Sequence, residues 1–407
     1  MVDIWEELNQ LWREYFALTV FKNEHLIKPL FHCWVGVHLT HHYKITFCGQ
    51  GKTFRVHPFI LQESGTGKSV AMKTTHFLLE ALGYRSVYTM SMNEPSLQGS
   101  ILILKNGETK RMPGALEDRD MIFWDEGSVL FRLAEHSKNI TEILQMTTDD
   151  PGYVSRRMLG GEVKFPTPTT ICAGSYMEEN IEKTILRKGL FQRMWTVFHT
   201  TTTKEKLDYF KNKHNMIAVH DHERKLLIEK IKNTLSKLAY SSQWVVINKD
   251  DYATVIEQAL PYFEENMLER SFKDKKENIL SSFISRNDLI LNLAGQRAVL
   301  SGRFVVNKED LEYGLEHYKQ HIRSAVELLQ GGQKIEDDRG DERIKIIVGL
   351  IRKRPLFYNI TKLRDELVQR EDWDIGKNVT GKFLNKLLLD KVIFSKDGEK
   401  NTILLFV

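Results

Sequence analysis

The stretch that most constrains this chain is FILQESGTGKSVAMKTT, residues 59–75, where a short apolar run meets a loop of small residues and then a helical pattern. It satisfies the phosphate-binding pattern G-x-x-x-x-G-K-[ST] at Gly67, Lys68 and Ser69, but Gln62 stands in place of the first glycine. A strand, a loop and a helix in this order predict a phosphate-binding loop, and the substitution at Gln62 leaves the geometry of the loop's first residue open.

Such a loop works through its backbone. Consecutive N–H groups must point inward at the β- and γ-phosphates, which requires small residues and positive φ angles. The residues predicted to line the anion are Glu63, Ser64, Gly65, Thr66 and Gly67. Lys68 supplies a positive charge to the phosphates, the Ser69 hydroxyl is a ligand for Mg²⁺, and the following helix presents its positive end. The alternative is a glycine turn with an incidental Gly-Lys-Ser. We expect a nucleoside triphosphate and Mg²⁺ to bind here.

A second signal is MIFWDE, residues 121–126, in which four apolar residues end in Asp125 and Glu126. This pattern predicts a buried strand that delivers two carboxylates to the ligand-binding edge of a parallel α/β sheet. There Asp125 holds Mg²⁺ and Glu126 polarises the attacking water. An apolar run that ends in Asp-Glu is weak evidence by itself, but it becomes stronger evidence in a chain that already carries a phosphate loop.

The composition argues against a disulfide-rich, zinc-binding, secreted or membrane-spanning protein. Of 407 residues, 28% are charged and 42% hydrophobic, which is typical of a globular protein with two or three domains. Cys33, Cys48 and Cys172 lack the spacing of a zinc site or a disulfide framework. The acidic start of the chain lacks the basic residues of a secretion signal, and no apolar stretch is long enough to span a bilayer. We expect a soluble, cytoplasmic protein without a membrane partner, and a net charge of +4 permits DNA binding without arguing for it.

The pattern along the chain predicts an α/β fold in several parts. They are an N-terminal helical segment and hairpin (1–58), an α/β nucleotide-binding core (59–202), a mainly helical lid (203–330), a linker (331–341) and a C-terminal domain (342–407). The last part reads as helices over 342–353, 361–370 and 376–390, followed by a hairpin, which is the order of a winged helix. Its third helix carries lysines that can meet either DNA or protein, namely Lys377, Lys382 and Lys386.

Two further hairpins are predicted within the core. Residues 101–112 contain an Asn-Gly turn, and residues 153–165 turn at Gly160-Gly161. Basic side chains suited to phosphate contacts lie on both: Lys105, Lys110 and Arg111 on the first, Arg156, Arg157 and Lys164 on the second. The alternative is that these residues only solvate the edges of the hairpins.

Together these motifs resemble the AAA+ ATPases, and among them the minichromosome-maintenance type of replicative helicase and its compact mobile-element and phage relatives. The most specific stretch is PSLQGSILILKNGETKRMPGALEDRDMIFWDE, which looks like the family's run from an insert hairpin through Gly114-Ala115-Leu116 to the Walker B strand. The resemblance covers roughly residues 25–330, with a winged helix behind it. It implies an AAA+ P-loop ATPase core with a helical lid.

The resemblance also implies roles. Lys68 and Ser69 match Walker A, and Asp125 and Glu126 match Walker B. Ser175 replaces the usual sensor-1 asparagine. The remaining two matches are arginines: Arg193, in the place of the arginine finger that acts on the neighbouring subunit's nucleotide, and Arg286, in the place of the sensor-2 arginine. The alternatives are a surface salt bridge for Arg193 and an ordinary arginine at the start of a helix for Arg286. The family's N-terminal DNA collar and zinc site have no counterpart in this sequence.

The function implied is an ATP-dependent DNA helicase or translocase. It would act as a homo-hexamer in replication of a mobile element or virus, with primase, polymerase or initiator supplied separately. Both hairpins would project into a central pore and grip single-stranded or forked DNA. Two alternatives remain: an AAA+ initiator or switch that binds DNA without unwinding it, and a protein-remodelling ATPase. The basic hairpins favour the helicase, because remodelling machines carry aromatic pore loops instead.

Overall fold

The structure, a computed structural model, divides into two compact units, Met1–Leu329 and Gln330–Val407. It describes residues 3–19, 24–63, 65–104, 106, 108–127, 135–149, 152–158, 161–176, 189–190, 192–199, 201–213, 221–238, 244–264, 288–353, 360–370, 377, 380–381, 384, 393–395 and 403–405.

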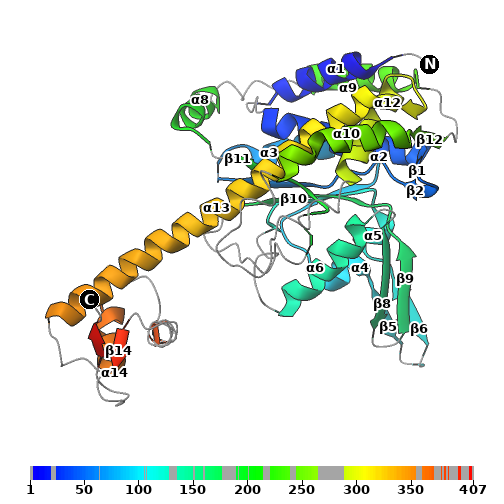
Figure 1. The fold of residues 1–407 in the computed structure, drawn as a ribbon. Helices are drawn as coiled ribbons and strands as arrows, with labels where there is room; N and C mark the ends of the chain where they lie inside the picture. Colours follow the sequence, from blue (N-terminus) through cyan, green and yellow to red (C-terminus); the bar gives the residue numbers. More distant parts are fainter. Residues whose placement is uncertain are drawn as a thin grey trace. The chain divides into compact units, whose positions relative to one another are not determined.

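The first unit is built on a five-stranded sheet (Figure 1). Its strands, in spatial order, are β11 (Trp195–His199), β3 (Pro58–Gln62), β10 (Thr170–Ser175), β7 (Met121–Trp124) and β4 (Ser86–Thr89). All neighbouring pairs are parallel. Every residue of β3, β7 and β10 is buried, as expected for strands of a parallel sheet with both faces covered. The predicted α/β class is confirmed, and so are the strand before the phosphate loop (β3) and the strand that leads to Asp125 (β7).

Parallel pairing determines where the strand ends meet. The carboxyl ends of β3, β7, β10 and β4 share one edge of the sheet, where Gln62, Asp125, Ser175 and Thr89 lie at or just beyond the ends of their strands. Ligands of open α/β sheets bind outside this edge. The amino ends of the same strands form the opposite edge.

Further helices of the first unit are α1 (Trp5–Ala17), α2 (Glu24–His42), α3 (Lys68–Ala81), α9 (Asp221–Leu235), α10 (Lys249–Phe263) and α12 (Asp288–Leu300). Of these, α2 and α3 pack on strands of this sheet, α1 and α12 pack on α2, and α9 packs on α1. A short helix, α8 (Thr203–Lys213), follows β11. The α2 helix is buried from Leu26 to Leu39 apart from Lys28, because it packs on three strands of the sheet and on both α3 and α12. The helices predicted near the N-terminus are therefore confirmed.

A second sheet was not predicted in full. It has the order β13 (Val305–Val306), β12 (Trp244–Ile247), β1 (Lys44–Phe47) and β2 (Gln50–Lys52). The β1–β2 hairpin is the one expected from the sequence, whereas β12 and β13 lie in the segment expected to be a mainly helical lid. The N-terminal segment and the lid segment are thus joined by parallel pairing of β1 with β12.

Both predicted core hairpins are present and lie side by side (Figure 1). The first consists of β5 (Ser100–Ile103) and β6 (Thr109–Met112), and the second of β8 (Tyr153–Met158) and β9 (Gly161–Pro166). The Arg111 guanidinium lies 5.1 Å from the centre of the Phe165 ring, which joins the two hairpins. Short helices α4 (Glu94–Gln98) and α5 (Ala115–Asp118) flank the first hairpin, and α6 (Glu135–Thr148) precedes the second.

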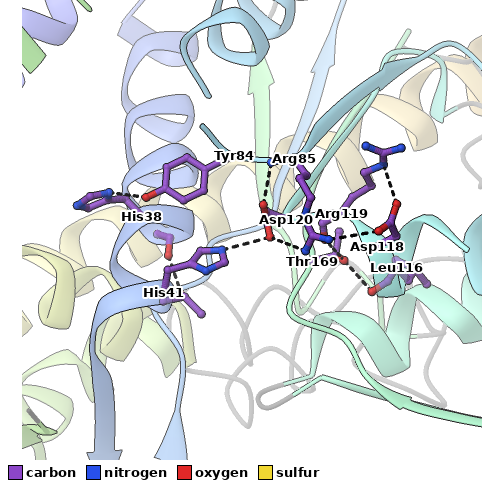
Figure 2. A network of polar contacts seen from close by, with 11 residues as sticks. His38, His41, Tyr84, Arg85, Leu116, Asp118, Arg119, Asp120 and Thr169 are labelled. Atoms are coloured by element: carbon purple, nitrogen blue, oxygen red, sulfur yellow. Dashed lines mark hydrogen bonds and ion pairs between the residues drawn. The ribbon is translucent and has the colours of Figure 1, made fainter. Parts of the chain in front are cut away.

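A polar network ties α2 to the amino edge of the central sheet (Figure 2). Asp120, just before β7, accepts a hydrogen bond from the Arg85 backbone N–H at 2.8 Å and pairs with His41 Nε2 at 3.2 Å. Burial alone raises the pKa of Asp120, but the hydrogen bonds from His41 and Arg85 outweigh it and lower the pKa to about 2. In the same network the Thr169 hydroxyl donates to the carbonyls of Leu116 and Arg119, at 2.8 and 2.7 Å, and so fastens α5 to the start of β10.

The second unit contains the end of a long helix, α13 (Lys308–Lys353), then α14 (Ile360–Val368) and an antiparallel pair, β14 (Ile393–Ser395) with β15 (Ile403–Leu405). The unit boundary falls beside the predicted linker, but residues 331–341 are helical and not irregular. The predicted hairpin is confirmed, whereas most of the predicted third helix lies outside the described residues. None of the described helices combines the length and apolarity that crossing a bilayer requires.

Candidate functional site

The loop predicted to bind phosphate joins β3 directly to α3 at the carboxyl edge of the sheet. Gly65 and Gly67 have φ angles of +77° and +93°, which glycine adopts without strain. The Gly67 carbonyl accepts the Ala71 N–H at 2.9 Å and begins the α3 hydrogen-bond ladder. Ser64 lies outside the described residues. The glycines therefore stand where the backbone must turn so that its N–H groups converge on an anion.

The replacement of the loop's first glycine has a structural explanation. Gln62 is the last residue of β3, paired in register with His199 of β11, and its φ angle is not positive. Its side chain is 1% exposed, and neither polar side-chain atom has a hydrogen-bond partner in the structure. The position belongs to the strand, so the turn itself is made by Gly65 and Gly67 and does not need a glycine at Gln62.

The Lys68 ammonium is buried at the start of α3, without a hydrogen-bond partner in the structure. Burial lowers the pKa of Lys68, and the carboxylates of Asp125 and Glu126 act in the opposite direction. The Tyr176 ring lies 4.4 Å from Nζ. A Cβ added to Gly174 would lie 2.8 Å from Lys68 Cδ, so the lysine stem passes directly over β10. A buried cation beside a loop of backbone donors is suited to a multiply charged anion.

Ser69 and Asp125, the two predicted Mg²⁺ ligands, are brought together. The Ser69 hydroxyl donates to Asp125 Oδ1 at 2.9 Å, and the Tyr88 hydroxyl donates to Asp125 Oδ2. Burial is the first cause, and the bond to Asp125 the second, of a Tyr88 pKa raised well above that of a free phenol. A hydroxyl and a carboxylate at this spacing supply the oxygen ligands that Mg²⁺ prefers, so the donor set fits the ion.

Glu126 and Ser175, the other two residues predicted at this edge, lie just beyond the end of β7 and at the end of β10, respectively. Glu126 follows Asp125 and is half-buried. Ser175 ends β10, in register with Leu61 of β3, and its buried hydroxyl has no hydrogen-bond partner in the structure. Lys68, Ser69, Asp125, Glu126 and Ser175 are therefore gathered at the carboxyl edge, as the sequence predicted.

Arg193 lies elsewhere. It precedes β11, whose first residue Trp195 pairs with Pro58 at the start of β3, so Arg193 sits at the amino edge. The four residue steps of β3 separate the two edges by about 13 Å. Arg193 Nε donates to Asp149 Oδ1 at 2.6 Å, and Nη1 donates to the Gly189 carbonyl at 2.8 Å. The arginine does not reach its own chain's loop. Arg286 lies outside the described residues.

The predicted DNA-contacting residues are placed unevenly. Lys110 is exposed on β6, whereas Arg111 is paired with Glu117 at 2.6 Å and Lys164 with Glu162 at 2.8 Å. Arg156 and Arg157 lie on β8, where only the backbone is described, and Lys105 lies outside the described residues. In the second unit, Lys377 pairs with Asp365 at 3.0 Å, and both Lys382 and Lys386 lie outside the described residues.

Sequence reasoning missed several neighbours of the site. Tyr88 and Tyr176 contact Asp125 and Lys68, respectively, and Lys206 of α8 forms an ion pair with Glu63 of the loop. Tyr88 carried a usable signal, because it lies in the β-favouring run YRSVYTM, residues 84–90, whose carboxyl end shares the edge of the site. Comparison of the sequence with known protein families and with curated proteins finds no match.

Proposed function

We propose that this chain is an ATP-dependent motor on DNA, an AAA+ helicase or translocase that hydrolyses ATP at the interfaces of a ring of identical subunits. The observation that carries the proposal is the buried ammonium of Lys68, which lies behind a loop with two positive-φ glycines and beside the Ser69–Asp125 pair. A buried cation without a hydrogen-bond partner is costly, and a triphosphate would offset that cost.

Each residue at the carboxyl edge has a role in this proposal. The loop backbone and Lys68 hold the β- and γ-phosphates, while Ser69 and Asp125 hold Mg²⁺. When bound, the ion neutralises charge that develops on the transferring phosphoryl group. The half-buried Glu126, just beyond β7, orients and polarises the attacking water, and the Ser175 hydroxyl, buried at the end of β10 without a hydrogen-bond partner, would assist it. Most of the rate enhancement then comes from charge stabilisation in a preorganised site.

The location of Arg193 supports an interface between subunits. A guanidinium at the amino edge, held in place by Asp149, is too far away to serve the loop of its own chain. A ring is built from head-to-tail contacts between two different surfaces of the subunit, and in the proposed ring these surfaces are the amino edge of one subunit and the carboxyl edge of the next. Arg193 then acts on the neighbour's γ-phosphate, a role worth on the order of 10³-fold or more in rate.

The two hairpins supply the DNA contact in this proposal. They are joined by the Arg111–Phe165 contact, and Lys110 and Lys164 add basic groups on β6 and β9. Such contacts to the phosphate backbone carry no sequence information and weaken with salt. The hairpins therefore suit movement along a strand more than recognition of one sequence.

The test is ATP turnover and unwinding of a labelled forked DNA by the full chain and by Glu126→Gln. The proposal predicts DNA-stimulated turnover and unwinding by the full chain. Glu126→Gln should keep nucleotide binding and lose turnover by about 10²-fold or more, the scale expected when a residue that positions the proton transfer is removed. Turnover without unwinding at any salt concentration would favour an initiator that only binds DNA. Absence of turnover would reject the ATPase itself.

A further inference from the structure

Arg55 is a buried residue that the proposed ATPase cycle does not use. It lies between β2 and β3, is 2% exposed, and places its guanidinium among backbone carbonyls from two segments, the end of α6 and the connection between β9 and β10. Nη1 donates to the carbonyls of Thr147, Thr167 and Thr169 at 3.3, 2.8 and 3.1 Å, and Nη2 donates to that of Asp149 at 3.0 Å. A buried charge with this many acceptors fixes their relative positions, because loss of any one leaves a polar group unsatisfied.

The first of these segments, the end of α6, connects Arg55 to Arg193. Thr147 and Asp149 are at the end of α6, where carbonyls lack partners within the helix and the helix dipole favours a cation. Asp149 thus has its backbone carbonyl held by Arg55, while its carboxylate holds Arg193 at 2.6 Å. One residue therefore links the two guanidinium groups.

The second segment is the base of hairpin β8–β9. Gly152 comes directly before β8, and its carbonyl accepts the Thr167 N–H at 3.0 Å, which closes the hairpin. A Cβ on Gly152 would lie 2.4 Å from the Thr147 carbonyl oxygen and 3.0 Å from Arg55 Nη2. The hairpin base is therefore packed directly against both the guanidinium and the end of α6.

The same segment also contacts the helix that follows the other hairpin. Thr169, whose carbonyl Arg55 holds, donates its hydroxyl to α5 at Leu116 and to the following Arg119 (Figure 2). The α5 helix follows β6, so the end of the first hairpin depends on the same anchor.

We infer that Arg55 is a positioning residue that sets the place of Arg193 through Asp149 and ties that place to the bases of the two hairpins. DNA bound by the hairpins then shifts the end of α6, and with it the arginine offered to the next subunit. This inference rests on the proposed function, and it assigns a residue that touches neither nucleotide nor DNA.

The test is complementation between variant subunits of the full chain. Lys68→Ala removes the nucleotide half of an interface site, and Arg193→Ala removes the arginine half. Mixing these two must regain turnover if the site is shared. If this mixture stays inactive, or the full chain itself is inactive, the proposed function fails before Arg55 is considered.

If that test establishes the shared site, Arg55→Lys should behave like Arg193→Ala. Lysine keeps the positive charge but cannot make the several hydrogen bonds of the guanidinium, so Arg193 would lose its position. Mixed with Lys68→Ala it should regain at least half of the turnover of the reference mixture. Mixed with Arg193→Ala it should stay within about twofold of either variant alone. The inference would be overturned if Arg55→Lys regained turnover when mixed with Arg193→Ala, or if it regained turnover with neither Lys68→Ala nor Arg193→Ala.

Asp149→Asn is the second variant, because Asp149 is 39% exposed at its side chain and its replacement leaves the core intact. It should give the same complementation pattern as Arg55→Lys, and the opposite pattern would overturn the inference even if Arg55→Lys failed to fold. Single-stranded DNA should no longer stimulate turnover by either variant, while the Kd for DNA changes less than threefold. Undiminished stimulation would reject the link to the hairpins.

Gln296→Leu is the matched control for a loss of buried hydrogen bonds. Gln296 Nε2 donates to the carbonyls of His32 and Phe54, at 2.9 and 2.8 Å, in the packing of α12 on α2. Gln296→Leu should lower the stability of the chain, but it should not regain turnover selectively with either Lys68→Ala or Arg193→Ala. A general defect in folding therefore cannot mimic the expected pattern.

Discussion

Mild acid should destabilise this protein through buried neutral histidines, and His321 offers the sharpest case. Its Nδ1 accepts the backbone N–H of Thr196 on β11 at 2.9 Å, and its side chain is 1% exposed. Protonation of Nδ1 would place its new N–H against the N–H of Thr196, so that two hydrogen-bond donors would face each other. Burial lowers the pKa of His321 to about 3, from about 6.5 in the unfolded chain.

The sign and size follow from proton linkage. Because the folded pKa is depressed, the unfolded chain binds the extra proton, so stability is complete above about pH 6.5 and falls as the pH drops toward 3. At pH 5.0 the loss for one such histidine is about 2 kcal/mol. The pKa values of His32 and His38 are likewise lowered to about 3 by burial, so three histidines together remove about 6 kcal/mol. That is a large part of a typical unfolding free energy of about 5–15 kcal/mol.

The assay is urea unfolding, followed by tryptophan fluorescence, at intervals between pH 7.5 and 5.0. His321→Asn keeps an acceptor near the Nδ1 position but does not titrate. It should reduce the slope of unfolding free energy against pH by about 1.4 kcal/mol per pH unit below pH 6. His222→Asn makes the same replacement at an exposed site and serves as the control. An unchanged slope in His321→Asn would refute the argument.

Three further predictions concern the proposed site. Tyr88→Phe removes the hydroxyl that holds Asp125, so the Mg²⁺ concentration for half-maximal ATPase activity should rise about tenfold; an unchanged requirement would contradict this. Gly174→Ala should weaken nucleotide binding about tenfold by displacing the buried lysine stem 2.8 Å away, whereas Gly51→Ala, with no neighbour nearer than 4.0 Å, should not; equal affinities would count against it. Lys110→Ala should lower the slope of log Kd for DNA against log salt by about one, and an unchanged slope would remove it from the DNA contact.

Local chemistry made much of the fold predictable. The buried runs of β3, β7 and β10 are continuous apolar segments bounded by polar residues, and the Asn-Gly pair of the first hairpin favours a tight turn on its own. Because three strands run in parallel, their chemical groups had to meet at one edge. The grouping of Lys68 with Asp125 therefore followed from the sequence order alone.

Features that depend on distant partners were not predictable. The β12 strand is four residues long with alternating exposure, and its pairing with β1 joins segments about two hundred residues apart. The contacts of Arg55 with the end of α6 depend equally on tertiary structure. The predicted linker was misleading for a different reason. Its three glycines cost a helix about 1 kcal/mol each, but this cost does not exclude a helix that also contains good helix formers such as Lys334, Glu336 and Arg339, and α13 continues through the segment.

In the proposed ring around DNA, one subunit's loop and the next subunit's Arg193 form a shared ATPase site. Electron microscopy of the full chain with a non-hydrolysable ATP analogue and forked DNA would image this site. We expect a six-fold ring with DNA against hairpins β5–β6 and β8–β9. Nucleotide should lie between Lys68 of one subunit and Arg193 of its neighbour. Particles that bind nucleotide without a second copy's Arg193 beside it would contradict the account.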